Sequence, residues 1–119
     1  VIAHALTDAL LGAAGLADVG ALFPSGNERY RGADSLGLLA DAYRQVGEAG
    51  FELVNADCVL IGESPRVAPH RDLMCERLAG ALGVDREKVN VRATTTDRLG
   101  FTGRGEGLAA QAVALLRRR

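Results

Sequence analysis

The sequence has almost no surplus of charge of either sign. Its 14 lysines and arginines stand against 15 aspartates and glutamates, which gives a formal net charge of -1. So small a net charge provides no strong overall field to attract nucleic acid or an acidic membrane surface. The chain ends with Arg117, Arg118 and Arg119, and we expect these cations to close the last helix, where they complement its dipole. We therefore predict neither nucleic acid nor a membrane as a partner.

Long apolar runs and cysteine pairs are also missing. No stretch approaches the roughly 18 apolar residues of a membrane-spanning helix, and the chain does not open with the pattern of a secretory leader. Cys58 and Cys75 are too far apart for a Cys-x-x-Cys site and lie in apolar segments. Free, buried thiols in a reducing compartment are the default for such cysteines. We expect a soluble, cytoplasmic protein.

Helical segments can be recognised by the spacing of their apolar residues. Helices are predicted from Val1 to about Leu16, from Asp34 or Ser35 to about Gly50, from about Pro69 to Gly83, and from about Glu106 through Leu115. Residues 15–32 have the composition of a loop. Because no capping residue precedes Val1, we expect that earlier sequence belongs to the start of the first helix.

Two segments change to the composition of strands. Residues 51–61 are apolar on both sides in their later half, as a covered sheet requires, and residues 89–93 alternate apolar and polar side chains. Helices and strands therefore alternate along a chain whose 119 residues suffice for one domain, residues 1–119, with a modest core. The sequence predicts an α/β fold.

The stretch from Thr94 to Gly107 has a composition that suits neither a helix nor a strand interior. Three threonines are followed at once by Asp97 and then by glycines interleaved with Arg104 and Glu106. Hydroxyls and backbone N–H groups can surround phosphate oxygens, and a neighbouring carboxylate can hold the cation that accompanies phosphate. The alternative is a tight loop in which threonine supplies turn hydrogen bonds and glycine supplies positive φ. The residues alone leave both readings open.

Two loops follow directly on the predicted strands, over residues 62–68 and 94–97. Ligands of open α/β sheets gather beyond the carboxyl ends of strands, so neighbouring strands would make these loops the two walls of one pocket. In the first helix, His4 and Asp8 share a face, a spacing at which a carboxylate can orient a metal-binding imidazole; a packed or capping histidine is the alternative. Asp18 beside Gly20 suits a pair of substrate hydroxyls or, equally, caps its own turn.

These segments resemble the 2-C-methyl-D-erythritol 2,4-cyclodiphosphate synthases of the non-mevalonate isoprenoid pathway. The likeness runs in order through residues 4–13, 18–20, 22–24, 32–35, Pro65, Pro69 with His70, 94–97 and 99–107. It implies a mixed sheet with helices packed on one side, assembled as a homotrimer whose active sites are shared between neighbouring subunits. The family's N-terminal β-hairpin, with its Asp-x-His motif, has no counterpart in this sequence. Ser25 stands where the family has aspartate, Arg66 where lysine is common, and Asp97 where glutamate is commoner.

The activity implied by the resemblance is a metal-dependent cyclisation by a phosphorus–oxygen lyase. The substrate 4-diphosphocytidyl-2-C-methyl-D-erythritol 2-phosphate gives 2-C-methyl-D-erythritol 2,4-cyclodiphosphate and CMP. Thr95 is the catalytic candidate, His4 a Zn²⁺ ligand whose fellow ligands lie in the Asp-x-His motif, and Asp97 a contact of Mg²⁺ or Mn²⁺. The substrate-binding residues implied are Asp18, Val19, Gly20, Gly62, Glu63, Ser64, Pro65, Arg66, Val67, Ala68, Thr94, Thr95, Thr96, Asp97, Phe101 and Arg104.

The resemblance also places Phe101 in a central cavity near the threefold axis, with Arg104 and Glu106 bridging subunits. Two other functions remain open. The chain could be a non-catalytic trimeric module that binds a nucleotide or an isoprenoid diphosphate, or one domain of a longer bifunctional enzyme.

Overall fold

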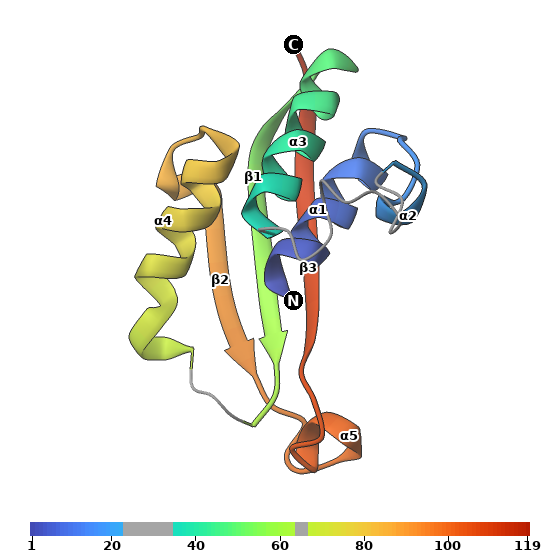
Figure 1. The fold of residues 1–119 in the computed structure, drawn as a ribbon. Coiled ribbons are helices and arrows are strands. Elements are labelled where there is room, and N and C mark those ends of the chain that lie inside the picture. The colour runs from blue at the N-terminus through green and yellow to red at the C-terminus, as the bar shows by residue number, and fades with distance from the viewer. Residues whose placement is uncertain (23–34, 64–66) are drawn as a thin grey trace.

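The computed structural model describes residues 1–22, 35–63 and 67–119. Their centre is a three-stranded sheet in the order β2-β1-β3 (Figure 1). Strand β1 (Phe51–Ile61) pairs in parallel with β2 (Val89–Thr94) and antiparallel with β3 (Ala109–Arg118). The sheet is therefore mixed, as predicted.

Three helices lie on one face of this sheet: α1 (Ile2–Ala13), α3 (Ser35–Glu48) and α4 (Arg71–Leu82) (Figure 1). Their predicted positions are confirmed, and α4 ends where predicted, at Gly83, which has a φ of 72° that suits glycine. Shorter turns of helix are α2 (Val19–Leu22), α5 (Gly100–Gly103) and 3-10 helices over Ala68–His70 and Arg86–Lys88. Among the helices of the described ranges, none has both the length and the apolar character needed to span a bilayer.

The core lies between the helices and the sheet. Leu6, Leu10 and Leu39 from the helices meet Leu53 and Val91 from the strands, and all five are fully buried. In β1 the pairing register with β3 shifts between Leu53 and Asn55, which marks a β-bulge. Because the bulge adds one residue, the buried positions are Leu53 before it and Ala56, Cys58 and Leu60 after it. Cys58 and Cys75 are both free and buried, which confirms that prediction.

The chain ends in a strand, so the predicted helix from Glu106 through Leu115 is wrong. Alanine and leucine are good helix formers, and their run in residues 109–116 has little polar spacing to distinguish a helical period from a strand period. In the structure every second residue packs on the core, namely Ala110, Ala112, Ala114 and Leu116. Pairing with the free edge of β1 along ten residues decides in favour of a strand. Strict alternation of helix and strand therefore fails at the C-terminus.

The terminal arginines accordingly close a strand and not a helix. The Arg117 Nε donates to Glu52 Oε1 at 2.7 Å, and this interaction lowers the pKa of Glu52. The Arg118 guanidinium lies 5.1 Å from the centre of the Phe51 ring. The Arg119 N–H donates to the carbonyl oxygen of Gly50 at 2.9 Å. These contacts fasten the end of β3 to the start of β1.

Candidate functional site

The carboxyl ends of β1 and β2 lie side by side, as predicted. The last matched pair of the ladder is Ile61 with Thr94, and the Gly62 N–H donates to the Thr94 carbonyl oxygen at 3.1 Å. Beyond this bond the two loops separate around a pocket of about 420 Å³. The pocket is lined by Gly62, Glu63, Val67, Ala68, Ala93, Thr94 and Thr95. The two predicted loops thus form the two walls of one pocket, while their role in holding a cytidine diphosphate group stays a prediction.

The wall that follows β1 begins with a close backbone approach. A Cβ atom on Gly62 would lie 2.3 Å from Leu108 Cδ2, so the missing side chain lets Leu108 pack against the start of this loop. Val67 is buried and fixes the far side of the loop at the beginning of the 3-10 helix. The predicted binding residues Ser64, Pro65 and Arg66, like Ser25, lie outside the described residues.

The three consecutive threonines divide into two kinds. The Thr96 hydroxyl donates to the Leu99 carbonyl oxygen at 2.6 Å and lies 3.0 Å from the buried Thr102 hydroxyl, so it holds the loop together. The Thr95 hydroxyl accepts from the Asp97 N–H at 3.2 Å and lies 3.4 Å from Asp97 Oδ1. Thr94 and Thr95 are exposed at the pocket. The Thr94 hydroxyl donates to the Thr95 carbonyl oxygen at 3.5 Å, so all three hydroxyls take part in hydrogen bonds of the loop. Thr94 and Thr95 differ from Thr96 in that they also line the pocket.

The backbone after Thr96 takes an uncommon conformation. Asp97 has a φ of 53° and Arg98 a φ of 68°, and among the described residues these are the non-glycine positions with positive φ. A Cβ atom on Gly103 would lie 2.1 Å from the Arg98 carbonyl carbon, so glycine is required where the loop closes on itself. The Arg98 N–H donates to Glu63 Oε1 at 2.8 Å, which joins the two walls of the pocket.

His4 and Asp8 lie one turn apart on the exposed side of α1, as their spacing predicts. Over residues 1–22, 35–63 and 67–119, no group of three or more histidine, cysteine, aspartate or glutamate side chains is placed to hold a metal ion. A structural or catalytic zinc ion needs at least three protein ligands. The described residues therefore do not by themselves fit a zinc site, and His4 would be a single ligand of one.

Asp18 caps a helix. Its Oδ1 accepts from the Ala21 N–H at 2.9 Å, at the start of α2 within the segment predicted as loop. Figure 1 shows α2 beside the C-terminal part of α1, far from the carboxyl ends of β1 and β2. Asp18, Val19 and Gly20 are thus not part of the pocket lining, and their role in substrate binding stays a prediction.

The glycine-rich segment before β3 carries an ion pair within the chain. Arg104 Nε donates to Glu106 Oε1 at 2.6 Å, and both side chains are more than half exposed. Phe101 is 50% exposed beside them. A second hollow of about 300 Å³ lies here, lined by Glu63, Gly105, Glu106, Gly107 and Leu108. The expectation that Arg104 and Glu106 bridge subunits stays a prediction, since in one chain they pair with each other.

A polar network on the outer face of the sheet was missed by the sequence analysis. Asp57 accepts from Arg92 Nη2 at 2.7 Å and from Asn90 Nδ2 at 3.2 Å. The hydrogen bond to Arg92 holds the pKa of Asp57 below its usual range, with partial burial acting against it. Arg71, the first residue of α4, donates to Asn90 Oδ1 and to the Val91 carbonyl oxygen. An aspartate inside an apolar strand was the signal that could have revealed this network.

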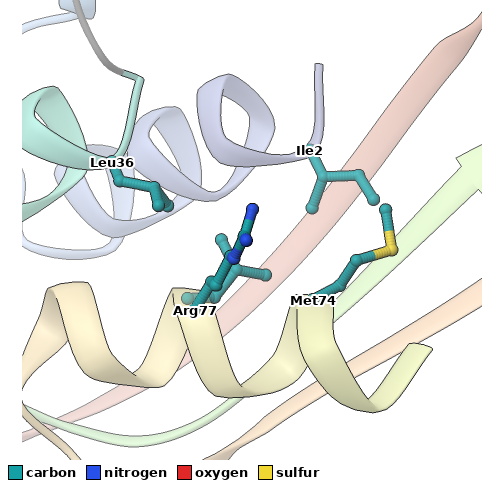
Figure 2. Close-up of a pocket in the computed structure, with 5 residues that line it drawn as sticks. Ile2, Leu36, Met74 and Arg77 are labelled. Carbon is teal, nitrogen blue, oxygen red and sulfur yellow. The ribbon is translucent and has the colours of Figure 1, made fainter. Parts of the chain in front are cut away.

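An apolar pocket of about 150 Å³ lies between α1, α3 and α4 (Figure 2). It is lined by Ile2, Leu36, Met74, Arg77 and Leu78, and Figure 2 shows Arg77 rising from α4 into the space between Leu36 and Ile2. Apart from this guanidinium the lining offers no polar group to orient a ligand. The pocket between the two loops is the better candidate for chemistry.

Comparison with known proteins shows the family to which the chain belongs. The model of the YgbB family matches residues 1–117. A protein from Rubrobacter xylanophilus is 62% identical over 118 residues, which cover 99% of this chain and 71% of the relative. A protein from Moorella thermoacetica is 58% identical over 116 residues, covering 98% of this chain and 71% of the relative. Both bear the name 2-C-methyl-D-erythritol 2,4-cyclodiphosphate synthase.

Solved structures give the same result. The bifunctional IspDF from Campylobacter jejuni superposes with a TM-score of 0.95 at 44% identity, over all of this chain and 32% of that one. The IspF of Plasmodium falciparum, solved as a CDP complex, superposes with a TM-score of 0.87 at 25% identity, over all of this chain and 71% of that one. The chain belongs to the YgbB family, whose relatives named here are 2-C-methyl-D-erythritol 2,4-cyclodiphosphate synthases.

Proposed function

We propose that this chain is the subunit of a cyclodiphosphate synthase of isoprenoid precursor biosynthesis, a phosphorus–oxygen lyase. It converts 4-diphosphocytidyl-2-C-methyl-D-erythritol 2-phosphate into 2-C-methyl-D-erythritol 2,4-cyclodiphosphate and CMP. The observation that carries the proposal is the pocket between the loops after β1 and β2, in a chain that belongs to this family. Its lining combines one wall of exposed backbone with a second wall of threonine hydroxyls.

The cytidine diphosphate group of the substrate is assigned to this pocket. Gly62 and Ala68 have little or no side chain, so a flat base can approach the backbone of the first wall. Thr94 and Thr95 face the pocket from the second wall and supply hydroxyl donors for phosphate oxygens. Solved structures of relatives that carry CDP support this assignment.

The reaction needs positioning and charge stabilisation more than acid–base chemistry. An oxygen of the 2-phosphate attacks the diphosphate phosphorus bonded to the erythritol, and the bond from that phosphorus to the CMP oxygen breaks. The Thr95 hydroxyl donates a hydrogen bond to the transferred phosphoryl group, whose charge is spread over its oxygens during transfer. Without substrate, the Thr95 hydroxyl accepts from the Asp97 N–H at 3.2 Å and donates to Asp97 Oδ1 at 3.4 Å, so its proton turns from that carboxylate to the phosphoryl oxygen when substrate binds.

Two divalent cations belong to the proposal. Mg²⁺ or Mn²⁺ is commonly held by one carboxylate together with substrate phosphates, so the exposed Asp97 fits this role with no further protein ligand. When bound, such an ion neutralises phosphate charge. A zinc ion at His4 would need ligands that the described residues do not supply, and no step is assigned to it here.

The assembly proposed is a homotrimer with shared active sites. On the sheet face opposite the helices, Val113 is 73% exposed and Leu115 57% exposed, an apolar surface that a second chain would bury. Figure 1 shows α2, whose start Asp18 caps, far from the carboxyl ends of β1 and β2, so a site that used both Asp18 and the threonine wall would join two subunits. The number three rests on the family resemblance. A cytoplasmic location is proposed as well, supported by the free thiols of Cys58 and Cys75.

The test is incubation of the protein with its proposed substrate and Mg²⁺, followed by phosphorus NMR and chromatography of nucleotides. We expect equal amounts of cyclic diphosphate and CMP, and a fall of at least about a hundredfold in kcat for Thr95→Val, which removes the hydroxyl at nearly constant volume. Binding of CDP without any turnover by the unaltered protein would instead support a non-catalytic nucleotide-binding module.

A further inference from the structure

Glu63 lies where the pocket of about 420 Å³ and the hollow of about 300 Å³ meet. It is the first residue of the loop after β1 whose side chain can reach across to the loop after β2. It lines the pocket that contains Thr94 and Thr95, and it also lines the second hollow beside Glu106. Glu63 is therefore shared by the linings of the two hollows.

The Glu63 carboxylate is engaged with backbone. Its Oε1 accepts a hydrogen bond of 2.8 Å from the Arg98 N–H, 35 residues further along the chain. A hydrogen bond from a backbone N–H to an ionised carboxylate is stronger than one between neutral groups. This bond joins the loop after β1 to the loop after β2.

Arg98, whose N–H donates this hydrogen bond to Glu63, has an unfavourable backbone conformation. Arg98 and the preceding Asp97 both have positive φ, which side-chain-bearing residues adopt at a cost and keep only where surroundings impose it. On the inner side of the loop, Thr96 with Thr102 and the tight approach of Gly103 to Arg98 fix its base. On the side of the pocket, the bond from Arg98 to Glu63 restrains it.

The Oε1 atom of Glu63 is already engaged by the Arg98 N–H at 2.8 Å. Repulsion between a carboxylate and the phosphates at the threonine wall favours this bond over a contact of Glu63 with those phosphates. To accept this backbone hydrogen bond, Glu63 needs only an oxygen acceptor like that of a carbonyl group.

We propose that Glu63 is a positioning residue, which holds the Thr95–Asp97 turn in its reactive orientation by accepting the hydrogen bond from the Arg98 N–H. The assignment of that turn to phosphoryl transfer rests on the proposed function. Glu63 acts through the turn and does not touch the reacting atoms.

The test compares Glu63→Ala, Glu63→Gln and a control, Glu76→Ala, in the complete protein in its native assembly. Glutamine keeps an oxygen acceptor of the same reach but loses the charge, and alanine loses both. Glu76 is an exposed glutamate of α4, outside the pocket lining. Two readouts are measured: kcat and KM for CMP release, and hydrogen exchange of the Arg98 amide by NMR.

For Glu63→Ala we expect kcat to fall about tenfold with KM changed by less than about threefold, since a misplaced catalytic turn affects the reaction more than ground-state binding. Exchange of the Arg98 amide should accelerate at least about tenfold as its acceptor is lost. Glu63→Gln and Glu76→Ala should stay within about twofold of the unaltered protein in both readouts.

Several results would overturn the proposal. They are unchanged Arg98 exchange in Glu63→Ala, unchanged kcat despite faster exchange, or a loss in Glu63→Gln as large as in Glu63→Ala. The last would assign the role to the charge. If the unaltered protein releases no CMP, the proposed function fails, and the exchange measurement still decides whether Glu63 restrains the turn.

Discussion

Asp57 is an acidic residue on the outer face of β1, and hydrogen bonds from Arg92 and Asn90 make that position favourable. Because hydrogen bonding to Arg92 lowers its pKa in the folded state, Asp57 stabilises the fold above its ordinary pKa and loses this contribution as the pH falls through the lowered value. The pair is partly exposed, with 35% of the Asp57 side chain and 61% of the Arg92 side chain accessible. Its contribution is therefore that of a screened surface pair.

Replacement of Asp57 by asparagine should lower the free energy of unfolding by about 0.5 kcal/mol at neutral pH. The difference should shrink as the pH falls through the lowered pKa of Asp57 and vanish in acid strong enough to protonate the aspartate in both states. Urea denaturation at the two pH values measures this, with the exposed Asp85→Asn as control. An equal loss at both pH values would show that packing, and not the ion pair, matters at this position.

Cys58, unlike the partly exposed Asp57, is fully buried. Burial raises the pKa of its thiol to about 12, so almost no reactive thiolate exists at neutral pH. Iodoacetamide should leave Cys58 and Cys75 unmodified in the folded protein at about pH 8 and alkylate both in concentrated guanidinium chloride. Mass spectrometry of peptides checks this. Rapid labelling of the native protein would contradict the burial of these cysteines.

The different roles of the three consecutive threonines could not be predicted from the sequence. Sequence predicted the cluster as a unit, yet Thr96 is tied to Thr102, six residues further on, while Thr95 faces the pocket. Three identical neighbours carry no local signal of this division. It depends on the positive φ of Asp97 and Arg98, which reverses the chain.

At the scale of elements, strong periodic patterns predicted α1, α3, β1 and α4 with nearly correct limits. Strand β3 was missed because its alanines and leucines satisfy either period, and the deciding interaction is with β1, which lies more than 45 residues earlier in the chain. The position of the candidate pocket was predictable nonetheless. It requires only that β1 and β2 be neighbours, and β3 lies on the other side of β1.

Arg71 links two elements that frame this pocket. It anchors the start of α4 to the free edge of β2 through the Val91 carbonyl oxygen and the Asn90 side chain. Arg71→Met should lower the free energy of unfolding by about 1–2 kcal/mol, the cost of losing hydrogen bonds from a charged donor. The control is Arg44→Met, which removes an exposed i,i+4 pair with Glu48 and should cost less than about 0.5 kcal/mol.

Chemical denaturation of the two variants compares these costs. Equal losses in Arg71→Met and Arg44→Met would mean that the link between α4 and β2 contributes nothing beyond an ordinary surface pair.

For the whole molecule, the proposed trimer would bury the sheet face opposite the helices. Val113→Lys places a charge beside Leu115 among the exposed apolar side chains of β3 and should convert the proposed trimer into monomers, because burial of an unpaired charge opposes assembly. Leu73→Lys is the control, since Leu73 is an exposed leucine on α4, on the helical side. Sedimentation velocity distinguishes the species. A trimer that tolerates Val113→Lys would require a different interface.

In the proposed trimer, each active site joins the threonine wall of one chain to residues of the α1–α2 region of a neighbour. A complementation experiment mixes two inactive variants, Thr95→Val and Asp18→Ala, under conditions that allow subunits to exchange. Random mixing of equal amounts restores about one quarter of the intersubunit sites. We predict recovery of CMP release to about a quarter of the unaltered activity. If exchanged assemblies remain as inactive as the separate variants, the site does not lie between subunits and the account is wrong.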